Sequence, residues 1–223
     1  MNILKKKAAR TAGTEPWHPY AWQAQSLLLA YPDENFAQRL ALAGQVASTL
    51  PEPVARPLLR FTTHAAQTAA ADLAIAYVAT FDHRKRCCPY LTYYAHGDTR
   101  KRGTALLRLK QTYTRAGWRL GDDELPDHLA VVLEFAATDP GTGAQLLIEH
   151  RAGLELLRLA LQDEGSPWAS VLESVSATLP ALAGDEREAV ARLAAQGPPE
   201  EQVGLDPYAS PVFLPDPVVG GPR

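Results

Sequence analysis

The stretch Leu129-Ala-Val-Val-Leu-Glu-Phe-Ala-Ala137 is apolar on every side except at Glu134. A helix with this pattern is normally central in a protein, because none of its faces suits water. Pro126-Asp127-His128 stands directly before it, and proline is favoured in the first turn of a helix. We therefore expect Pro126 to begin a buried helix around which the other helices pack.

Several other segments place apolar side chains at the three- and four-residue spacing of helices. We expect these helices over residues 19–29, 36–50, 54–81, 98–116, 142–162, 168–179 and 185–196, the third of them with a kink or a break. No segment shows the alternation of a strand or the repeat period of a solenoid. The sequence therefore predicts an all-α fold, a single-domain helical bundle without a sheet, over residues 16–197.

Both ends of the sequence differ from this helical part. Residues 1–15 are polar and basic without a period, which predicts a disordered N-terminal arm. Residues 198–223 hold seven prolines in 26 residues, and such a composition cannot build a core. We expect residues 198–223 to form a Pro/Gly-rich flexible tail.

Three residues mark expected helix ends or weak points. Asp98 is a plausible N-cap for the helix that reaches Ala116, and Gly117 suits the position just after it. The long helix from Thr142 to Gln162 contains Gly153, which is a poor helix former and so its expected weak point.

The composition favours an ordinary globular protein of a reducing compartment. The 223 residues are 46% hydrophobic and carry a net charge of −3, which argues against a general nucleic-acid binder. The only cysteines are adjacent, so they give no disulfide framework. No stretch approaches the roughly 18 apolar residues of a membrane span, and no apolar run follows Lys5-Lys6-Lys7 as it would in a secretory signal. We expect a cytoplasmic protein without direct membrane insertion.

The charges are unevenly distributed along the chain. Ten Lys or Arg and the single acid Asp98 lie between Arg84 and Arg119, whereas residues 120–140 hold six acids and no Lys or Arg. Arg100-Lys101-Arg102 lies near an expected helix N-terminus, where an anion would be favoured. These basic groups leave open an anion contact, a nucleic-acid-binding adaptor, or a solvated surface.

The acidic segment offers candidate binding residues. Asp127 suits the positive end of a helix dipole, so Asp127-His128 is either a simple helix start or the rim of a pocket. Glu134 is the lone charge of its helix and must find a partner, such as Arg108 or Arg151, or face a cavity.

The tyrosine-rich segment 90–97 has two interpretations. Tyrosine offers apolar area with a polar end, so Tyr90, Tyr93 and Tyr94, with His96, could line a peptide groove. Aromatic clusters are also common in cores, and we expect Tyr93 or Tyr94 to be buried.

Metal chemistry has little support. Adjacent thiolates such as Cys87-Cys88 rarely chelate one ion, so no metal site is expected. The pairs Asp82-His83 and Asp127-His128 leave a metal-dependent phosphohydrolase of an all-helical class as the alternative enzyme.

Three motifs carry a resemblance to a known family: TFDHRKRC at 80–87, YLTYYAHGDTRKRG at 90–103 and DDELPDHLAVVLEFAA at 122–137. In these, the chain resembles the NarJ-type assembly chaperones (delta subunit) of respiratory nitrate reductase, within the molybdoenzyme maturation chaperones. The resemblance is dense over residues 74–137, looser over 17–73 and 142–196, and absent from both ends.

The resemblance implies a chaperone and not an enzyme. Such a protein binds the apo catalytic (alpha) subunit of nitrate reductase, including its N-terminal peptide, and assists insertion of the molybdenum cofactor and the iron–sulfur centre. It also delays docking on the membrane anchor. No cofactor is bound permanently, although molybdopterin guanine dinucleotide could be contacted transiently through the client. A monomer or weak homodimer is expected.

The resemblance also suggests where the client would bind. In related chaperones the Asp-His pair at this helix start lies in the groove that receives the client peptide, and the neighbouring acids would extend a negative rim. The residues expected to bind the client peptide are Tyr90, Tyr93, Tyr94, His96, Asp122, Asp123, Glu124, Asp127, His128 and Glu134. The residues expected to contact an anion are Arg100, Lys101 and Arg102.

Overall fold

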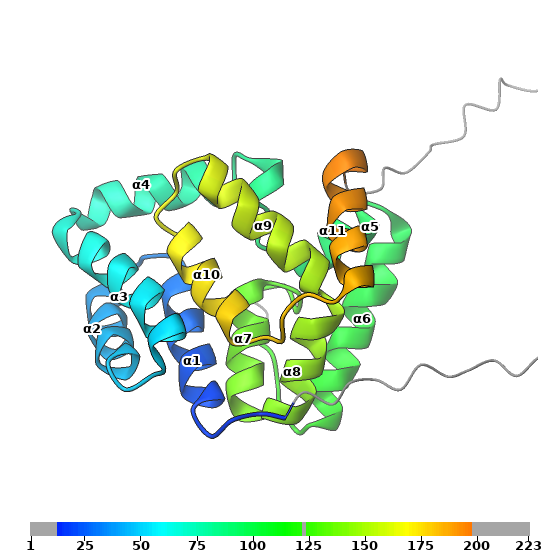
Figure 1. The fold of residues 1–223 in the computed structure, drawn as a ribbon, viewed down its shortest axis with the longest axis horizontal. Coiled ribbons are helices and arrows are strands. Elements are labelled where there is room, and N and C mark those ends of the chain that lie inside the picture. Colours follow the sequence, from blue (N-terminus) through cyan, green and yellow to red (C-terminus); the bar gives the residue numbers. More distant parts are fainter. Residues whose placement is uncertain (1–12, 122–123, 198–223) are drawn as a thin grey trace, which may run out of the picture.

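The computed structural model describes residues 13–121 and 124–197 (Figure 1). These residues form helices joined by short connections, and their only sheet-like contact is an isolated bridge between Tyr90 and His128. The elements are α1 (His18–Leu29), α2 (Phe36–Ala47), α3 (Glu52–Gln67), α4 (Ala70–Phe81), the 3₁₀ helix η1 (Lys85–Cys87), α5 (Leu91–His96), α6 (Arg100–Arg115), α7 (Leu129–Thr138), α8 (Pro140–Glu149), α9 (Arg151–Asp163), α10 (Ala169–Ala177) and α11 (Gly184–Gln196). The predicted all-α fold is confirmed.

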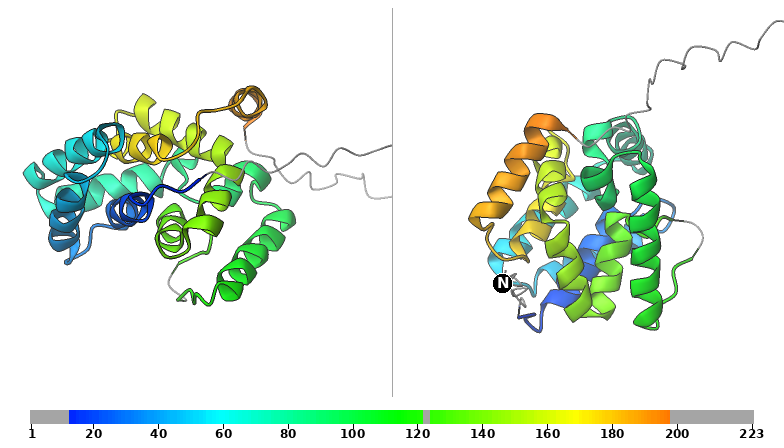
Figure 2. Two further views of the ribbon diagram at one scale, coloured as in Figure 1. Left: turned by 60° about the horizontal axis from the view of Figure 1, so that its bottom comes forward. Right: turned by 90° about the vertical axis from the view of Figure 1, so that its right-hand side faces the viewer.

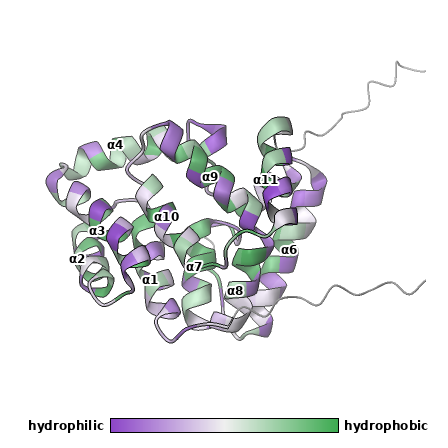
Figure 3. Ribbon diagram, viewed as in Figure 1, coloured by the Kyte–Doolittle hydropathy of each residue, from purple (hydrophilic) through white to green (hydrophobic). Residues whose placement is uncertain are grey.

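The helices pack around α1, α7 and α10. Helix α1 contacts α2, α7 and α10, while α10 also packs against α3 and α9 (Figures 1 and 2). Buried apolar side chains from α1 through α10 belong to one continuous cluster. Helix α6 lies at an edge of the molecule and has a markedly hydrophilic surface, whereas α7 is mostly apolar (Figures 2 and 3).

Helix α7 is central, as its composition predicted. Seven of its ten residues are buried, and Glu134 is the exposed exception within its apolar run. Helix α8 approaches α7 very closely at Gly143, where an added Cβ would lie 2.2 Å from the Cα of Ala136. This contact is available only to glycine, because any side chain would overlap the backbone of α7.

Buried polar groups fix the packing of α1. The indole Nε1 of Trp22 donates to Thr178, and Gln25 donates to Ser174 (3.0 and 2.9 Å). Ser26 donates to the carbonyl of Ala130 on α7 at 2.8 Å, and Trp168 donates to the carbonyl of Leu28 at 3.2 Å. A buried donor without a partner is costly, so these bonds specify how α1 is placed on its neighbours.

Two expected helix starts were wrong. Pro126 and Asp127 lie in a turn before α7, which begins at Leu129, because residues 127–129 are held instead by backbone bonds to residues 89–91. Asp98 does not cap α6. The residue before that helix is Thr99, and the Asp98 carboxylate faces Arg102.

The expected long helix over 142–162 is two helices that meet at His150. Its predicted weak point was also wrong, since Gly153 lies within α9, where a Cβ would be 3.0 Å from Tyr94. The chain turns at His150 because α8 packs on α7, whereas α9 packs on α5, α10 and α11. Gly117 has a φ of 76° just after α6, as predicted. The domain limits at residues 15 and 197 stay predictions.

Candidate functional site

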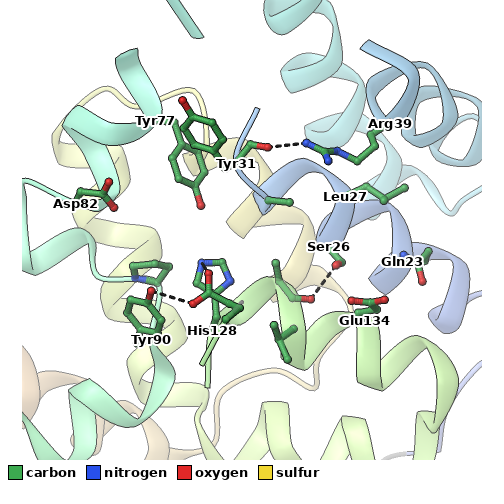
Figure 4. A pocket seen from close by; sticks show the side chains of 15 residues that line it. Gln23, Ser26, Leu27, Tyr31, Arg39, Tyr77, Asp82, Tyr90, His128 and Glu134 are labelled. Atoms are coloured by element: carbon green, nitrogen blue, oxygen red, sulfur yellow. Dashed lines mark hydrogen bonds and ion pairs between the residues drawn. The ribbon is translucent and has the colours of Figure 1, made fainter. Parts of the chain in front are cut away.

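A groove of about 480 Å³ opens between α1, the end of α4, the segment 89–90, the segment 124–131 and Glu134 of α7 (Figure 4). Its lining mixes apolar and polar side chains in similar measure, and three of the polar ones are carboxylates. The lining residues are Gln23, Ser26, Leu27, Ala30, Tyr31, Arg39, Tyr77, Asp82, Pro89, Tyr90, Glu124, His128, Ala130, Val131 and Glu134. The acids are Asp82, Glu124 and Glu134, and Arg39 already pairs with Asp33 at 3.0 Å.

One corner of the groove joins three of the predicted residues. The hydroxyl of Tyr90 donates to the Glu124 carboxylate at 3.1 Å, and the rings of Tyr90 and His128 meet edge to face with centroids 5.2 Å apart. Nε2 of His128 is 4.0 Å from the other Glu124 oxygen. Burial lowers the pKa of His128, while Glu124 and Asp127 act in the opposite direction. Burial, and then the Glu124 charge, raise the pKa of Tyr90, so its phenol stays a hydrogen-bond donor.

This corner is supported from behind by an ion pair between the buried Asp127 and the half-buried Arg102. The Asp127 carboxylate is completely buried and accepts hydrogen bonds from the backbone N–H and the hydroxyl of Thr92. Arg102 reaches the same carboxylate at 3.5 Å, and its guanidinium lies over the Tyr90 ring, 5.5 Å from the centroid. Because Tyr90 is in the groove and Arg102 is behind it, the pair fixes the position of the groove wall.

The backbone links the same two segments. Leu91 N–H donates to the carbonyl of Asp127, and Leu129 N–H donates to the carbonyl of Pro89, both at 2.9 Å. These bonds flank the bridge between Tyr90 and His128. They explain why the Pro-Asp-His turn and the tyrosine-rich segment lie together.

The structure divides the predicted peptide-binding residues into groups. Tyr90, Glu124, His128 and Glu134 line the groove. Asp127 does not reach its rim, contrary to our expectation, because it is turned inward to Thr92 and Arg102. Asp122 and Asp123 lie outside the described residues.

Glu134 faces the groove and has no ion pair in the part of the chain that the structure describes, so neither Arg108 nor Arg151 is its partner. Figure 4 shows its carboxylate on the α7 side of the groove, away from Asp82. An exposed carboxylate on an apolar helix is therefore available to a ligand.

Tyr93, Tyr94 and His96 lie away from this groove. Tyr94 is buried, as expected for one of the pair, and its hydroxyl donates to the carbonyl of Cys88 at 2.9 Å. Tyr93 and Tyr94 instead line a second groove. His96 lies near Lys101, Arg108 and His150, and burial followed by their charges lowers its pKa. The tyrosine-rich segment therefore supplies one residue to the groove and several to its surroundings.

The predicted anion-contact residues are also divided. Arg100 and Lys101 are exposed on α6. Arg102 instead contacts Asp127, Asp98 and the Tyr90 ring, and its expected contact with an anion stays a prediction.

Sequence reasoning missed the opposite wall of the groove. Leu27, Tyr31 and Tyr77 supply apolar surface, and Asp82 supplies a carboxylate. Asp82 could have been predicted as a groove residue from its place in the first motif, directly after an apolar helix. Nothing local distinguishes Leu27 from the apolar residues of α1 that are buried.

Two properties of the described residues bear on the alternatives. Residues 13–121 and 124–197 contain no group of three or more His, Cys, Asp or Glu that could hold a metal ion. Over the same ranges, no helix combines the length and apolarity that crossing a bilayer requires.

Comparison with known proteins shows the relationship. A family model described as nitrate reductase delta subunit matches residues 47–173. The nitrate reductase-like protein NarX of Mycobacterium tuberculosis is 37% identical over 163 residues, which are 73% of this chain and 24% of NarX. The chain therefore spans about a quarter of that relative's length.

Shorter relatives match over more of their length. NarJ of Bacillus subtilis is 34% identical over 71% of this chain and 87% of its own. The nitrate reductase molybdenum cofactor assembly chaperone NarJ of Escherichia coli K12 is 31% identical, over 66% of this chain and 64% of its own.

A solved structure shows the same fold. A candidate redox enzyme maturation protein from Archaeoglobus fulgidus superposes with a TM-score of 0.53 at 22% identity, covering 84% of this chain and 99% of its own. This likeness concerns the fold alone. The family match over more than half of the chain and the identity to NarJ proteins establish the relationship: the chain belongs to the nitrate reductase delta subunit family.

Proposed function

We propose that this protein is a cytoplasmic assembly chaperone for the catalytic subunit of a nitrate reductase, and that its groove binds the N-terminal peptide of that subunit. The family and the names of the NarJ relatives support the chaperone role. The observation that carries the peptide site is a groove that combines apolar side chains with three carboxylates, one of which, Glu134, has no ion pair in the described part of the chain.

The chemistry of the groove fits an amphipathic helix with basic side chains. Apolar anchors of such a helix would lie on Leu27, Tyr31 and Val131, and its cations would pair with Glu134 and Asp82. Glu124 is engaged by Tyr90 through one oxygen, while the other faces His128. Charge-assisted hydrogen bonds would thus orient the peptide, and apolar burial would supply most of the affinity.

Chaperone action requires a preference for the incomplete client. A ligand shifts an equilibrium only by its differential affinity for the two states. If the client's N-terminal helix becomes sequestered in the finished enzyme, the groove loses its target once maturation is complete. A difference of about 4 kcal/mol gives roughly a thousandfold preference. In this proposal the bound chaperone delays membrane docking while the molybdenum cofactor and iron–sulfur centre enter.

The exposed pair Arg100 and Lys101 is proposed to contact the client's anionic cargo, the pyrophosphate of molybdopterin guanine dinucleotide, transiently during insertion. Both side chains are exposed at the first turn of α6, where backbone N–H groups favour an anion. Normal cofactor loading of the client by an Arg100→Ala/Lys101→Ala variant would remove this part of the proposal.

The peptide site is tested by calorimetric titration with a peptide of the client's first few tens of residues. We expect Glu134→Lys to weaken binding at least about tenfold, equivalent to ~1.4 kcal/mol, because a carboxylate facing the ligand becomes a cation. The matched control is Glu149→Lys, the same charge reversal at an exposed residue of α8 outside the groove.

The two variants separate a local contact from a general charge effect. Equal affinity in wild type and Glu134→Lys would refute the groove assignment, and equal weakening in both variants would reduce it to long-range electrostatics. Failure of the full chain to co-purify with the apo-subunit, together with salt-sensitive retention on RNA, would favour the nucleic-acid adaptor instead.

A further inference from the structure

A second groove of about 450 Å³ lies on the other side of the tyrosine-rich segment, between η1, α5, α9 and α11. Tyr90 faces the first groove, while Tyr93 and Tyr94, three and four residues later, line the second. Figure 1 shows α11 beside α5 and α9. No part of the proposed function uses this surface.

The second groove has an apolar floor and a basic edge. Leu156, Leu159 and Leu193 supply the floor, and Leu159 is 40% exposed. Lys85 and Arg86 lie at the edge. An apolar surface of this kind beside free positive charge fits a segment that combines apolar and acidic residues.

The two cations differ in their availability. Arg86 is paired with Glu164 at 2.9 Å and lies 3.8 Å from Asp163. Lys85 is exposed and has no ion-pair partner among residues 13–121 and 124–197. An acidic occupant would therefore gain a new partner at Lys85 without breaking an existing pair.

The chain itself supplies a segment of this chemistry at the edge of the groove. Gly197 is the last described residue and is part of the groove lining. The next residues are Pro198-Pro-Glu200-Glu201-Gln-Val203-Gly-Leu205, an acidic pair followed by two apolar side chains. Glu200 and Glu201 follow Gly197 by three and four residues, so an extended chain keeps both within roughly 10–14 Å of this groove residue.

We propose that residues 198–208 bind back into this second groove, with Glu200 and Glu201 at Lys85 and with Val203 and Leu205 on the Leu156–Leu159 floor. Tethering makes the contact intramolecular, with an effective concentration on the order of millimolar. An intrinsic Kd below about 1 mM is then enough to keep the groove mostly occupied.

Photo-crosslinking in the full chain tests this contact. Leu159→p-benzoylphenylalanine places the crosslinker in the groove, and Ile75→p-benzoylphenylalanine is the control at an exposed site on α4. We expect Leu159 crosslinks within one chain to map by mass spectrometry to residues 198–208, and Ile75 crosslinks not to do so.

Charge exchange tests the proposed orientation. On the Leu159 crosslinker background, Lys85→Glu and Glu200→Lys/Glu201→Lys should each lower the crosslink yield about threefold, as expected for exposed ion pairs. The triple variant Lys85→Glu/Glu200→Lys/Glu201→Lys should recover the crosslink yield, and this recovery would exclude misfolding as the cause of the lower yields. Crosslinks between two chains would overturn the proposal in favour of a second copy as occupant. An absence of crosslinks to 198–208, or yields insensitive to charge, would overturn it as well.

Discussion

Replacing Asp127 distinguishes a supporting residue from a ligand contact. The family resemblance implied that its carboxylate lies at the rim of a client groove, whereas the structure buries it completely against Thr92 and Arg102. If the structure is right, Asp127→Ala lowers the stability of the protein. If the rim interpretation were right, the same change would lower client binding and leave stability unchanged.

The magnitude follows from the groups left behind. Removing one partner of a buried ion pair costs roughly 3–5 kcal/mol, because the other charge is left unpaired. The side chain of Arg102 is 18% exposed and also reaches Asp98, so water and that second carboxylate recover part of the loss. The Thr92 N–H loses its side-chain acceptor as well, at about 1 kcal/mol. We expect Asp127→Ala to cost about 3 kcal/mol.

Urea unfolding followed by circular dichroism gives this number directly. In thermal unfolding, a protein of this size loses about 2–4 °C of Tm per kcal/mol of stability, so the Tm of Asp127→Ala should be roughly 6–12 °C lower. The control is Asp127→Asn, which keeps an acceptor for Thr92 but also leaves Arg102 unpaired, so it should cost about 2 kcal/mol, roughly 1 kcal/mol less than Asp127→Ala. A stability loss in Asp127→Ala below about 0.5 kcal/mol, the scale of ordinary surface changes, would refute the buried-support assignment.

Two further predictions concern packing and pH. Gly143→Ala should destabilise the protein by about 3 kcal/mol in thermal unfolding, since its Cβ would lie 2.2 Å from a backbone atom of α7, whereas Gly103→Ala, with no atom within 4 Å, should be neutral or slightly stabilising. Burial lowers the pKa of His128, so below about pH 6.5 this side chain is protonated more readily in the unfolded chain than in the folded one. The free energy of unfolding should therefore fall as the pH drops below about 6.5. His128→Gln should make this loss smaller in urea titrations between about pH 6.5 and pH 5; an equal loss in wild type and His128→Gln would contradict the assignment.

The helices could be predicted from periodicity because burial of an apolar face is a local property of the sequence. The stretch 129–137 shows this best, since an all-round apolar pattern leaves only a central position. The turn before it could not be predicted. Pro126 resembles a helix start. The turn is held instead by backbone hydrogen bonds between residues 127–129 and residues 89–91, which are far apart in the sequence.

Gly153 shows the same limit within a helix. Its low helix propensity suggested a break, yet it lies inside α9, where the missing side chain admits the Tyr94 ring. The break is at His150, where the packing partner changes from α7 to α5. Propensity describes the isolated helix, and the partner that overrides it is invisible in the local sequence.

The sequence predicted several of the residues that surround the groove, but it did not predict which of the charged side chains are buried. Residue type and resemblance brought Tyr90, Glu124, His128 and Glu134 into one set, and the structure places them around one groove. The same reasoning could not decide which charges face inward. A carboxylate and an arginine buried as a pair have the same sequence signature as two exposed charges, since nothing in the sequence shows that Asp127 lies 3.5 Å from Arg102.

This arrangement separates the shape of the groove from its selectivity. Arg102 from the second motif supports Tyr90 and pairs with Asp127 from the third, so these motifs meet behind one wall. On the opposite wall, Gln23 and Leu27 of α1 face the groove and belong to none of the three motifs. If the groove binds a peptide as proposed, Arg102 and Asp127 act on it only through the position of Tyr90, whereas α1 contacts it directly. Selectivity for one client should then depend on α1 and on the motif carboxylates that face the groove, Asp82 and Glu134, while Arg102 and Asp127 maintain the groove's shape.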